Sequence, residues 1–289
     1  MDPLTMPRAL VRAAERHGRE EWLTTLPRTV HELKERWALT VGEPFQPGGQ
    51  CAWVAPVRDS TGAQLVLKVG WPHPEAAHEA DGLGEWAGDG TVQLHATAEL
   101  EEATVLLIER CIPGTAADSR PEEEQDVIVA GLLRRLWRKP APGHRFRTLQ
   151  TMCDMWADEF EERTAAKVVL DPGLTRDGVA LFRSLPATAE QEVLLCTDLH
   201  AGNVLAARRE PWLVIDPKPY VGDPAYDVVQ HLVNCKARLL ADPRELVSRL
   251  AGLAGLDKDR VRLWLFARCV EESIHSPVLV DVARRLAPS

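Results

Sequence analysis

The stretch that decides the fold is VLLCTDLHAGNVLAARREPWLVIDPKPYVGDPAYD, residues 193–227. A short apolar run leads into a polar loop that carries Asp198 and Asn203, and a later apolar run ends in Asp216. Two short strands flanking such a loop would present these three side chains at one end. Two carboxylates and a carboxamide oxygen are hard ligands, so the pattern predicts a site for Mg²⁺ with a bound phosphate.

The order D-x-x-x-x-N followed by a strand-terminal Asp is typical of the catalytic and metal-binding segments of kinase-like phosphotransferases. In this hypothesis Asp198 accepts the proton of a substrate hydroxyl. Asn203 and Asp216 hold the metal that bridges the phosphates of ATP. The alternative is a polar turn between two core strands, in which Asp and Asn serve turn geometry.

Upstream, Lys68 lies in the apolar run LVLKV, which predicts a largely buried strand. A buried ammonium needs a partner, because an unpaired one is costly. Glu79, in a helix expected over residues 75–86, is the natural candidate, with Glu75 in reserve. A Lys–Glu pair over phosphates is the kinase arrangement. The alternative is an edge-strand lysine that faces solvent.

Two further segments suit a nucleotide. The turn that contains Gly48 and Gly49 lets backbone N–H groups approach phosphate oxygens, although a plain hairpin is the alternative. The run LLIERCIPG predicts a strand that enters a hinge. Backbone groups from Glu109 to Cys111 are then expected at an adenine edge, while the charged side chains there could equally be solvated.

The periodicity of the chain changes at this hinge. The first forty residues predict helices, short β-type runs follow, and helical spacing dominates after residues 111–124. We therefore predict an α+β fold. A small N-terminal lobe, residues 1–112, would hold the sheet and the nucleotide, and a larger helical lobe, residues 113–289, would hold the catalytic loop and the substrate site.

The composition disfavours some classes of binding partner. The formal charge of 34 − 43 = −9 argues against a nucleic-acid partner held by a basic surface, and favours a cationic small molecule. No apolar run approaches the ~20 residues that span a bilayer, so no membrane partner is expected. The six cysteines include no CxxC pair, which suggests reduced thiols. We expect a cytoplasmic monomer.

Together these elements resemble the aminoglycoside phosphotransferase superfamily, and within it the streptomycin 6-phosphotransferase and hydroxyurea phosphotransferase family of antibiotic-resistance kinases. The segments LVLKV, LLIERCIPG, TDLHAGNVL and WLVIDPKPYVGDPAYDV occur in the family's order. The resemblance implies a two-lobed protein-kinase-like fold, with ATP, Mg²⁺ and transfer of the γ-phosphoryl group to a hydroxyl of an aminoglycoside-type antibiotic. The family's loop usually begins His-Gly-Asp, whereas this chain has Cys196-Thr197-Asp198, which implies altered loop support.

The resemblance also assigns roles to individual residues. It makes Asp198 the catalytic base, His200 a support of the loop, and Lys218 a group that approaches phosphate or substrate or pairs with Asp223. The remaining assignments are two metal ligands, one lysine for the α- and β-phosphates and its acidic partner: Asn203, Asp216, Lys68 and Glu79.

Four carboxylates are candidates for the substrate side: Asp223, Asp227, Glu271 and Glu272. They would attract a polycationic antibiotic. Asp227 could instead cap or brace the helix that begins near Pro224, and the two glutamates could form an exposed helix face.

Three other functions stay open from the sequence. The first is a kinase of a non-antibiotic metabolite. The second is a nucleotide-binding pseudokinase module, which Cys196-Thr197 would favour. The third is a metal-dependent phosphohydrolase built on Asp198, His200 and Asp216, although a single nearby histidine is thin for a dinuclear site.

Overall fold

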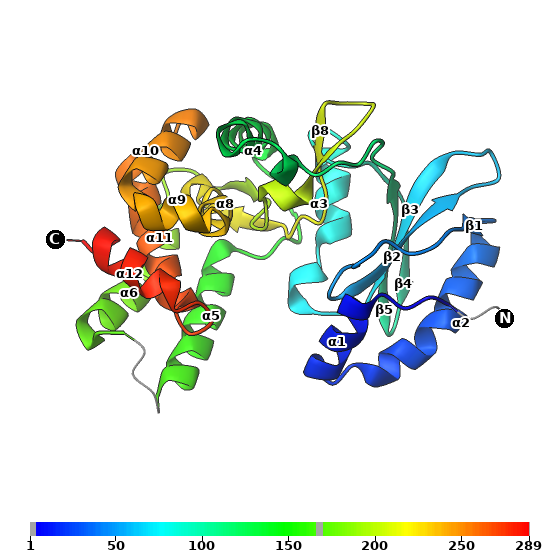
Figure 1. Cartoon of the computed structure of the whole chain (residues 1–289), viewed down its shortest axis with the longest axis horizontal. Helices are drawn as coiled ribbons and strands as arrows, with labels where there is room; N and C mark the ends of the chain where they lie inside the picture. Colours follow the sequence, from blue (N-terminus) through cyan, green and yellow to red (C-terminus); the bar gives the residue numbers. More distant parts are fainter. Residues whose placement is uncertain (1–3, 166–169, 289) are drawn as a thin grey trace. The chain divides into compact units, whose positions relative to one another are not determined.

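The structure is a computed structural model that describes residues 4–165 and 170–288. It divides into two compact units (Figure 1). Unit 1 contains the described residues up to Gly114 together with Ala207–Arg209, and unit 2 contains Thr115–Ala206 and the residues from Glu210 onward. Each unit has its own secondary structure and core, and they are described in turn.

Unit 1 is built on an antiparallel sheet of five strands in the order β1-β2-β3-β5-β4. Lys68 lies on the third strand of the chain, where it is paired with Val54 on one side and with Leu106 on the other. The lysine is therefore on a central strand and not at an edge. The strands are β1 (Thr40–Val41), β2 (Ala52–Arg58), β3 (Gln64–Gly70), β4 (Leu94–Leu100) and β5 (Ala103–Glu109).

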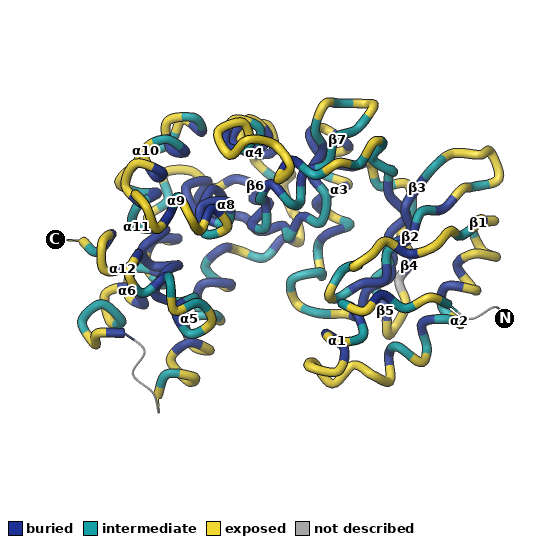
Figure 2. Tube along the Cα trace, in the orientation of Figure 1, coloured by how far each residue is buried: buried dark blue, intermediate teal, exposed yellow. Residues whose placement is uncertain are grey.

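Two N-terminal helices, α1 (Arg8–His17) and α2 (Glu20–Arg36), cover one face of this sheet (Figure 1). Their buried residues form one core with alternate strand residues such as Trp53, Leu67 and Val105. Because successive strand side chains point to opposite faces, Lys68 belongs to the other face. The alternation of buried and exposed residues along α2 is visible in Figure 2.

The segment after β3 begins with a short 3-10 turn, Pro74–Ala76, and continues as helix α3, Glu79–Trp86. The expected helix over residues 75–86 is therefore shorter, and Glu79 stands in its first turn. Leu83 and Trp86 bury one side of α3. This packing fixes the position of α3. Glu79, the predicted partner of Lys68, is the first residue of this helix.

Unit 2 is mostly helical. Helix α11 is its most buried long helix, and it contacts α6, α8 and α12. At Gly178 of α6 an added Cβ would lie 2.5 Å from the side chain of Val270, so this close helix contact requires glycine. The helices are α4 (Glu122–Leu136), α5 (Leu149–Thr164), α6 (Pro172–Ser184), α7 (Pro224–Asp227), α8 (Val229–Asn234), α9 (Lys236–Ala241), α10 (Pro243–Ala254), α11 (Lys258–Glu272) and α12 (Val278–Leu286).

Two small antiparallel pairs lie within unit 2. Strand β6 (Val193–Leu195) pairs with β9 (Tyr220–Gly222), and β7 (Val204–Ala206) pairs with β8 (Trp212–Val214). Short 3-10 turns lie at Ala117–Ser119, Pro186–Thr188 and Ala201–Asn203. The predicted α+β class, with a sheet in the first part of the chain and helices in the second, is confirmed. The division at residue 112 into lobes with separate functions stays a prediction.

Among the described residues, no helix is both long and apolar enough to cross a bilayer.

Candidate active site

The polar loop of residues 196–203, called the catalytic loop below, follows β6 directly. Asp198 N–H donates to Cys196 O at 2.7 Å, and Asn203 N–H donates to His200 O at 2.9 Å. His200 Nδ1 accepts from Gly202 N–H at 3.1 Å, so its ring caps the 3-10 turn. Burial lowers the pKa of His200, and the neutral ring suits this acceptor role. The predicted supporting contact of His200 is therefore present.

Asn203 and Asp216 are brought together by the β7–β8 pair. The register of this pair sets Val204 opposite Val214. One residue further along, Ile215 N–H donates to Asn203 O at 2.9 Å. Asp216 follows at once, with φ +54°. Few residues other than glycine adopt this left-handed backbone, and where they do the strain is often at a functional site.

The side chain of Asn203 is oriented by the loop itself. Its Nδ2 donates to Asp198 O at 3.0 Å, which assigns Oδ1 as the atom that can meet a cation. A carboxamide oxygen and a carboxylate from Asp216 are ligands that Mg²⁺ accepts. The residues present therefore fit the expected metal.

Within the described part of the chain, the carboxylate of Asp198 has one partner on each oxygen. Gln230 Nε2 donates to Oδ1 at 2.8 Å, and Lys218 Nζ lies 3.0 Å from Oδ2. The side chain of Asp198 keeps 16% of its surface exposed. Gln230 was not predicted from the sequence, because it lies 32 residues from Asp198 in the chain. The partner of Lys218, open from the sequence, includes Asp198 in the structure.

Asp227 supports the catalytic loop by binding its backbone. Its carboxylate accepts from the backbone N–H groups of Cys196 and Thr197 at 3.0 and 2.6 Å, and from Trp137 Nε1 at 2.9 Å. Burial raises the pKa of Asp227 to about 6, against these three donors, which lower it. The side chain of Asp227 is fully buried on protein donors, and a substrate-side role for it stays a prediction.

Asp223 is also a structural carboxylate. It caps α7 through Ala225 N–H at 2.9 Å, and it accepts from Trp264 Nε1 at 2.6 Å and from the guanidinium of Arg260. It is 3% exposed. Its oxygens therefore already serve a buried network. A substrate-side role of Asp223 stays a prediction, and the ion pair that the structure gives Lys218 is the one with Asp198.

Glu271 and Glu272 share one cation. Arg268 forms an ion pair with Glu271 and another with Glu272 at 2.9 Å, and it stacks over the ring of Trp156 at 4.6 Å. Burial raises the pKa of Glu271, while Arg268 lowers it. A substrate role for the two glutamates stays a prediction, now with their charge partly offset by Arg268.

In unit 1, Lys68 Nζ lies 2.7 and 2.6 Å from the two oxygens of Glu79. Both side chains are largely buried. The pair forms on the face of the sheet opposite the α1–α2 core, as the alternation of side chains along β3 requires. The contact predicted from the sequence is present, and its role toward a nucleotide stays a prediction.

The glycine turn of unit 1 has a local explanation. Gly48 has φ +83°, and an added Cβ would lie 2.5 Å from Pro7 Cβ. Glycine is therefore required at this position by backbone and packing alone. A phosphate role for Gly48 and Gly49 stays a prediction.

At the end of β5, Glu109 makes backbone and side-chain contacts within unit 1. Glu109 N–H donates to Gln93 O at 2.8 Å, and its carboxylate accepts from Gln93 N–H and from Arg209. The Glu109 amide is therefore already bonded within unit 1. The expected role of backbone groups from Glu109 to Cys111 at an adenine edge stays a prediction. Burial raises the pKa of Cys111 to about 12, and its backbone role stays a prediction.

Arg209 is a structural residue that the sequence analysis missed. It belongs to unit 1 as part of the segment Ala207–Arg209, although the chain before and after this segment belongs to unit 2. Besides Glu109, its guanidinium donates to Gly88 O and Thr91 O, both at 2.7 Å. These acceptors follow α3, so Arg209 fixes the turn at the end of that helix.

A second group of charged residues lies buried in unit 2 and is called the Asp126 cluster: Asp126, His231, Arg238 and Arg249. Asp126 accepts from all three partners, at 3.1, 2.7 and 2.7 Å. Together with Cys235, Asp126 and His231 have the spacing of metal ligands among the described residues. Two guanidinium groups already neutralise the carboxylate, so the cluster does not fit a cation.

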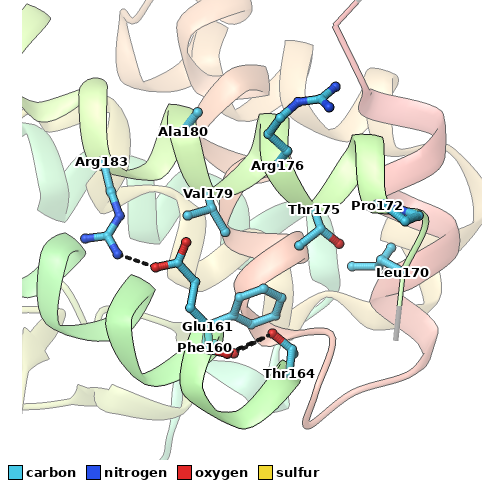
Figure 3. A pocket seen from close by; sticks show the side chains of 10 residues that line it. All are labelled: Phe160, Glu161, Thr164, Leu170, Pro172, Thr175, Arg176, Val179, Ala180 and Arg183. Carbon is cyan, nitrogen blue, oxygen red and sulfur yellow. Dashed lines mark hydrogen bonds and ion pairs between the residues drawn. The ribbon is translucent and has the colours of Figure 1, made fainter. Parts of the chain in front are cut away.

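The structure also contains a cavity of about 510 Å³ between α5 and α6 (Figure 3). Phe160, Leu170 and Val179 give it apolar walls, and Glu161 is joined to Arg183 at its rim. The ten lining residues include none of the predicted site residues. The roles assigned to the catalytic loop therefore do not depend on this cavity.

Sequence comparison extends the argument from these residues to the whole chain. The sequence model of the family described as aminoglycoside/hydroxyurea antibiotic resistance kinase matches residues 36–276. The streptomycin 6-kinase of Streptomyces griseus is 33% identical, over 100% of this chain and 95% of that protein. The hydroxyurea phosphotransferase of Kitasatospora aureofaciens is 36% identical, over 93% of this chain and 79% of that protein.

Solved structures agree on the fold. A macrolide 2'-phosphotransferase from Brachybacterium faecium matches with a TM-score of 0.56 and 16% identity, over 90% of this chain and 98% of that chain. A choline kinase from Cryptosporidium parvum matches with a TM-score of 0.53 and 11% identity, over 87% of each chain. The predicted two-lobed, protein-kinase-like α+β fold is thereby confirmed. The chain belongs to the aminoglycoside/hydroxyurea antibiotic resistance kinase family, and it is a small-molecule phosphotransferase.

Proposed function

We propose that this protein transfers the γ-phosphoryl group of ATP to a hydroxyl of an aminoglycoside-type antibiotic similar to streptomycin. The observation that carries the proposal is the catalytic loop of a family member, in which Asp198 keeps an oriented and partly exposed carboxylate. The streptomycin 6-kinases at 33% identity support this acceptor class. The net charge of −9 agrees in sign with a cationic acceptor.

In the proposed reaction Asp198 takes the proton of the acceptor hydroxyl as its oxygen attacks the γ-phosphorus. The bond from that phosphorus to the bridging oxygen breaks, and ADP leaves. His200 and Asp227 hold the loop so that the carboxylate does not reorganise during the step. Positioning and charge neutralisation supply most of the rate in such transfers.

The metal and the nucleotide are assigned to chemically suited groups. Asn203 Oδ1 and the Asp216 carboxylate would hold Mg²⁺, which neutralises phosphate charge when bound. Lys68, oriented by Glu79, would bind the α- and β-phosphates. Removal of one charge-assisted contact of about 1.5–3 kcal/mol should raise the KM for ATP by about 10- to 100-fold in Lys68→Met.

The test is acceptor-dependent turnover by the purified full chain. ADP formation is measured with Mg·ATP over a panel of aminoglycosides, and the product is checked by mass spectrometry for one added phosphoryl group. We expect turnover with a streptomycin-like acceptor, and loss of Mg-dependent ATP use in Asp216→Ala. Nucleotide binding without turnover on any acceptor would contradict the proposal and favour a pseudokinase module.

The hydroxyurea phosphotransferase at 36% identity supports a second acceptor, hydroxyurea itself. Hydroxyurea is a far smaller molecule than an aminoglycoside, and it carries no charge. The panel therefore includes hydroxyurea, and the ratio of kcat/KM for the two acceptors decides between them. A large preference for hydroxyurea would replace the aminoglycoside in the proposal and leave the phosphoryl transfer intact.

A further inference from the structure

A lysine outside the catalytic loop is fixed to it at three points. Lys218 N–H donates to Cys196 O at 2.9 Å, and Lys218 O accepts from Thr197 Oγ1 at 2.6 Å. Its ammonium lies 3.0 Å from Asp198 Oδ2. All of these groups belong to unit 2, so these three contacts are made within one unit.

Stability does not explain this arrangement. The Lys218 side chain is 28% exposed, and partly exposed ion pairs typically contribute about 0–1 kcal/mol. The loop already has buried support from Asp227 and a cap from His200. What the ammonium does provide is a positive charge next to the Asp198 carboxylate, where a triphosphate is proposed to react.

We propose that Lys218 is a catalytic residue that neutralises first the Asp198 carboxylate and then the phosphoryl group in transfer. The inference rests on the proposed function. When the acceptor proton passes to Asp198, that carboxylate loses its charge and attracts the Lys218 ammonium less strongly. At the same moment the new oxygen–phosphorus bond forms, the bond to the bridging oxygen breaks, and ADP leaves with its electron pair. The ammonium then binds the negative oxygens of the transferred group.

Gln230 provides the internal comparison. It holds the other oxygen of Asp198, at 2.8 Å, with a neutral amide. Gln230 can therefore orient the base, but it cannot neutralise a phosphoryl group. If Lys218 only oriented the carboxylate, losing either partner would have a similar effect. If its charge matters in the transition state, the loss of Lys218 should be much the larger.

The experiment compares kcat and KM of the full chain in four variants. In Lys218→Met we expect kcat to fall about 100- to 1000-fold, the usual cost of removing a transition-state stabiliser, with small changes in either KM. Lys218→Arg should recover part of the loss because it keeps the charge. Gln230→Leu should lose about tenfold or less. Lys236→Met, the same change at an exposed lysine, should match the original protein.

Thermal unfolding of each variant checks that it is folded. A kcat within twofold of the original in folded Lys218→Met, or equal losses in Lys218→Met and Gln230→Leu, would overturn the inference and leave the proposed function standing. If Lys218→Met does not fold, Lys218→Arg decides. Substantial activity in Lys218→Arg supports the role of the charge, and activity as low as that of Asp198→Ala overturns it. An original protein inactive on every acceptor would overturn the proposed function itself.

Discussion

Two carboxylates of unit 2 gather polar and charged partners in different ways. Asp198 has one partner on each oxygen, and its side chain is 16% exposed. Asp126 has three partners and no exposed surface. The partners of Asp126 include two guanidinium groups, whereas Asp198 faces one ammonium and one amide.

The difference separates a reactive carboxylate from a structural one. A group that must exchange a proton with a substrate needs accessible surface and an incomplete set of partners. A buried carboxylate needs the opposite, because an unpaired buried charge costs several kcal/mol. Asp227 stands with Asp126 by this criterion, although it is part of the same motif as the catalytic loop.

The largest expected effect tests the reactive side of this comparison. Asp198→Ala should lower kcat by about 10³-fold, because general-base assistance typically contributes 10²- to 10⁴-fold. Its free energy of unfolding should change by about 1 kcal/mol or less, since the ion pair is partly exposed. Steady-state kinetics and chemical denaturation check the two halves. Activity like that of the original protein would remove Asp198 as the base.

The next effect tests the structural side. Asp126→Ala should lower the free energy of unfolding by about 3–5 kcal/mol, because it leaves two arginines without their shared buried counterion. The molecules that remain folded should keep kcat within a few-fold. Denaturant unfolding and active-site-normalised kinetics measure this. A large loss of kcat in a stable variant would show that the Asp126 cluster also serves the reaction.

Substitution of Asp227 should lower both the free energy of unfolding and kcat, each by less than in the two variants above. Asp227→Ala leaves three buried N–H donors without an acceptor, at a cost of about 2–3 kcal/mol in unfolding free energy. Because two of these donors belong to Cys196 and Thr197, kcat should also fall by about tenfold as the loop loosens. Asp227→Asn keeps one oxygen acceptor and should lose less of both. A stable Asp227→Ala variant with unchanged kcat would show that the loop does not need this support.

The pH dependence of stability should follow Asp126. Burial raises the pKa of Asp126, but hydrogen bonds from His231, Arg238 and Arg249 outweigh burial and hold it well below its usual range. A lowered folded pKa stabilises the fold above the unfolded value of 3.8, and this contribution is lost as the pH falls below it. The expected slope is about 1.4 kcal/mol per pH unit. Unfolding of Asp126→Asn between pH 5 and pH 2 should lack that part of the slope; an identical slope would contradict the assignment.

The smallest effect comes from a surface ion pair. Arg284 Nη1 lies 2.8 Å from Asp281 Oδ1, and both side chains are more than half exposed. Arg284→Met should change unfolding free energy by about 0.5 kcal/mol or less and leave kcat unchanged. The variant serves as the baseline for the four larger effects, measured by the same denaturation and kinetic assays.

The sequence by itself determined the features that depend on neighbours in the chain. The spacing of Asp198 and Asn203, the strand-terminal Asp216 and the alternation that sends Lys68 to one sheet face are local, because strand period and loop length fix them. The Lys68–Glu79 contact also spans only 11 residues. The family resemblance rested on these segments, and the comparisons confirmed it.

Only the tertiary structure decided which carboxylates are already in use. Asp223 and Asp227 have the same sequence character as reactive acids. Arg260 and Trp264 of α11 reach Asp223, however, and Trp137, which directly follows α4, reaches Asp227. The partners of Asp126 lie 105–123 residues away. A carboxylate's reactivity depends on its solvation and on every donor that reaches it, and those donors are assembled by the packing of helices that are remote in the chain.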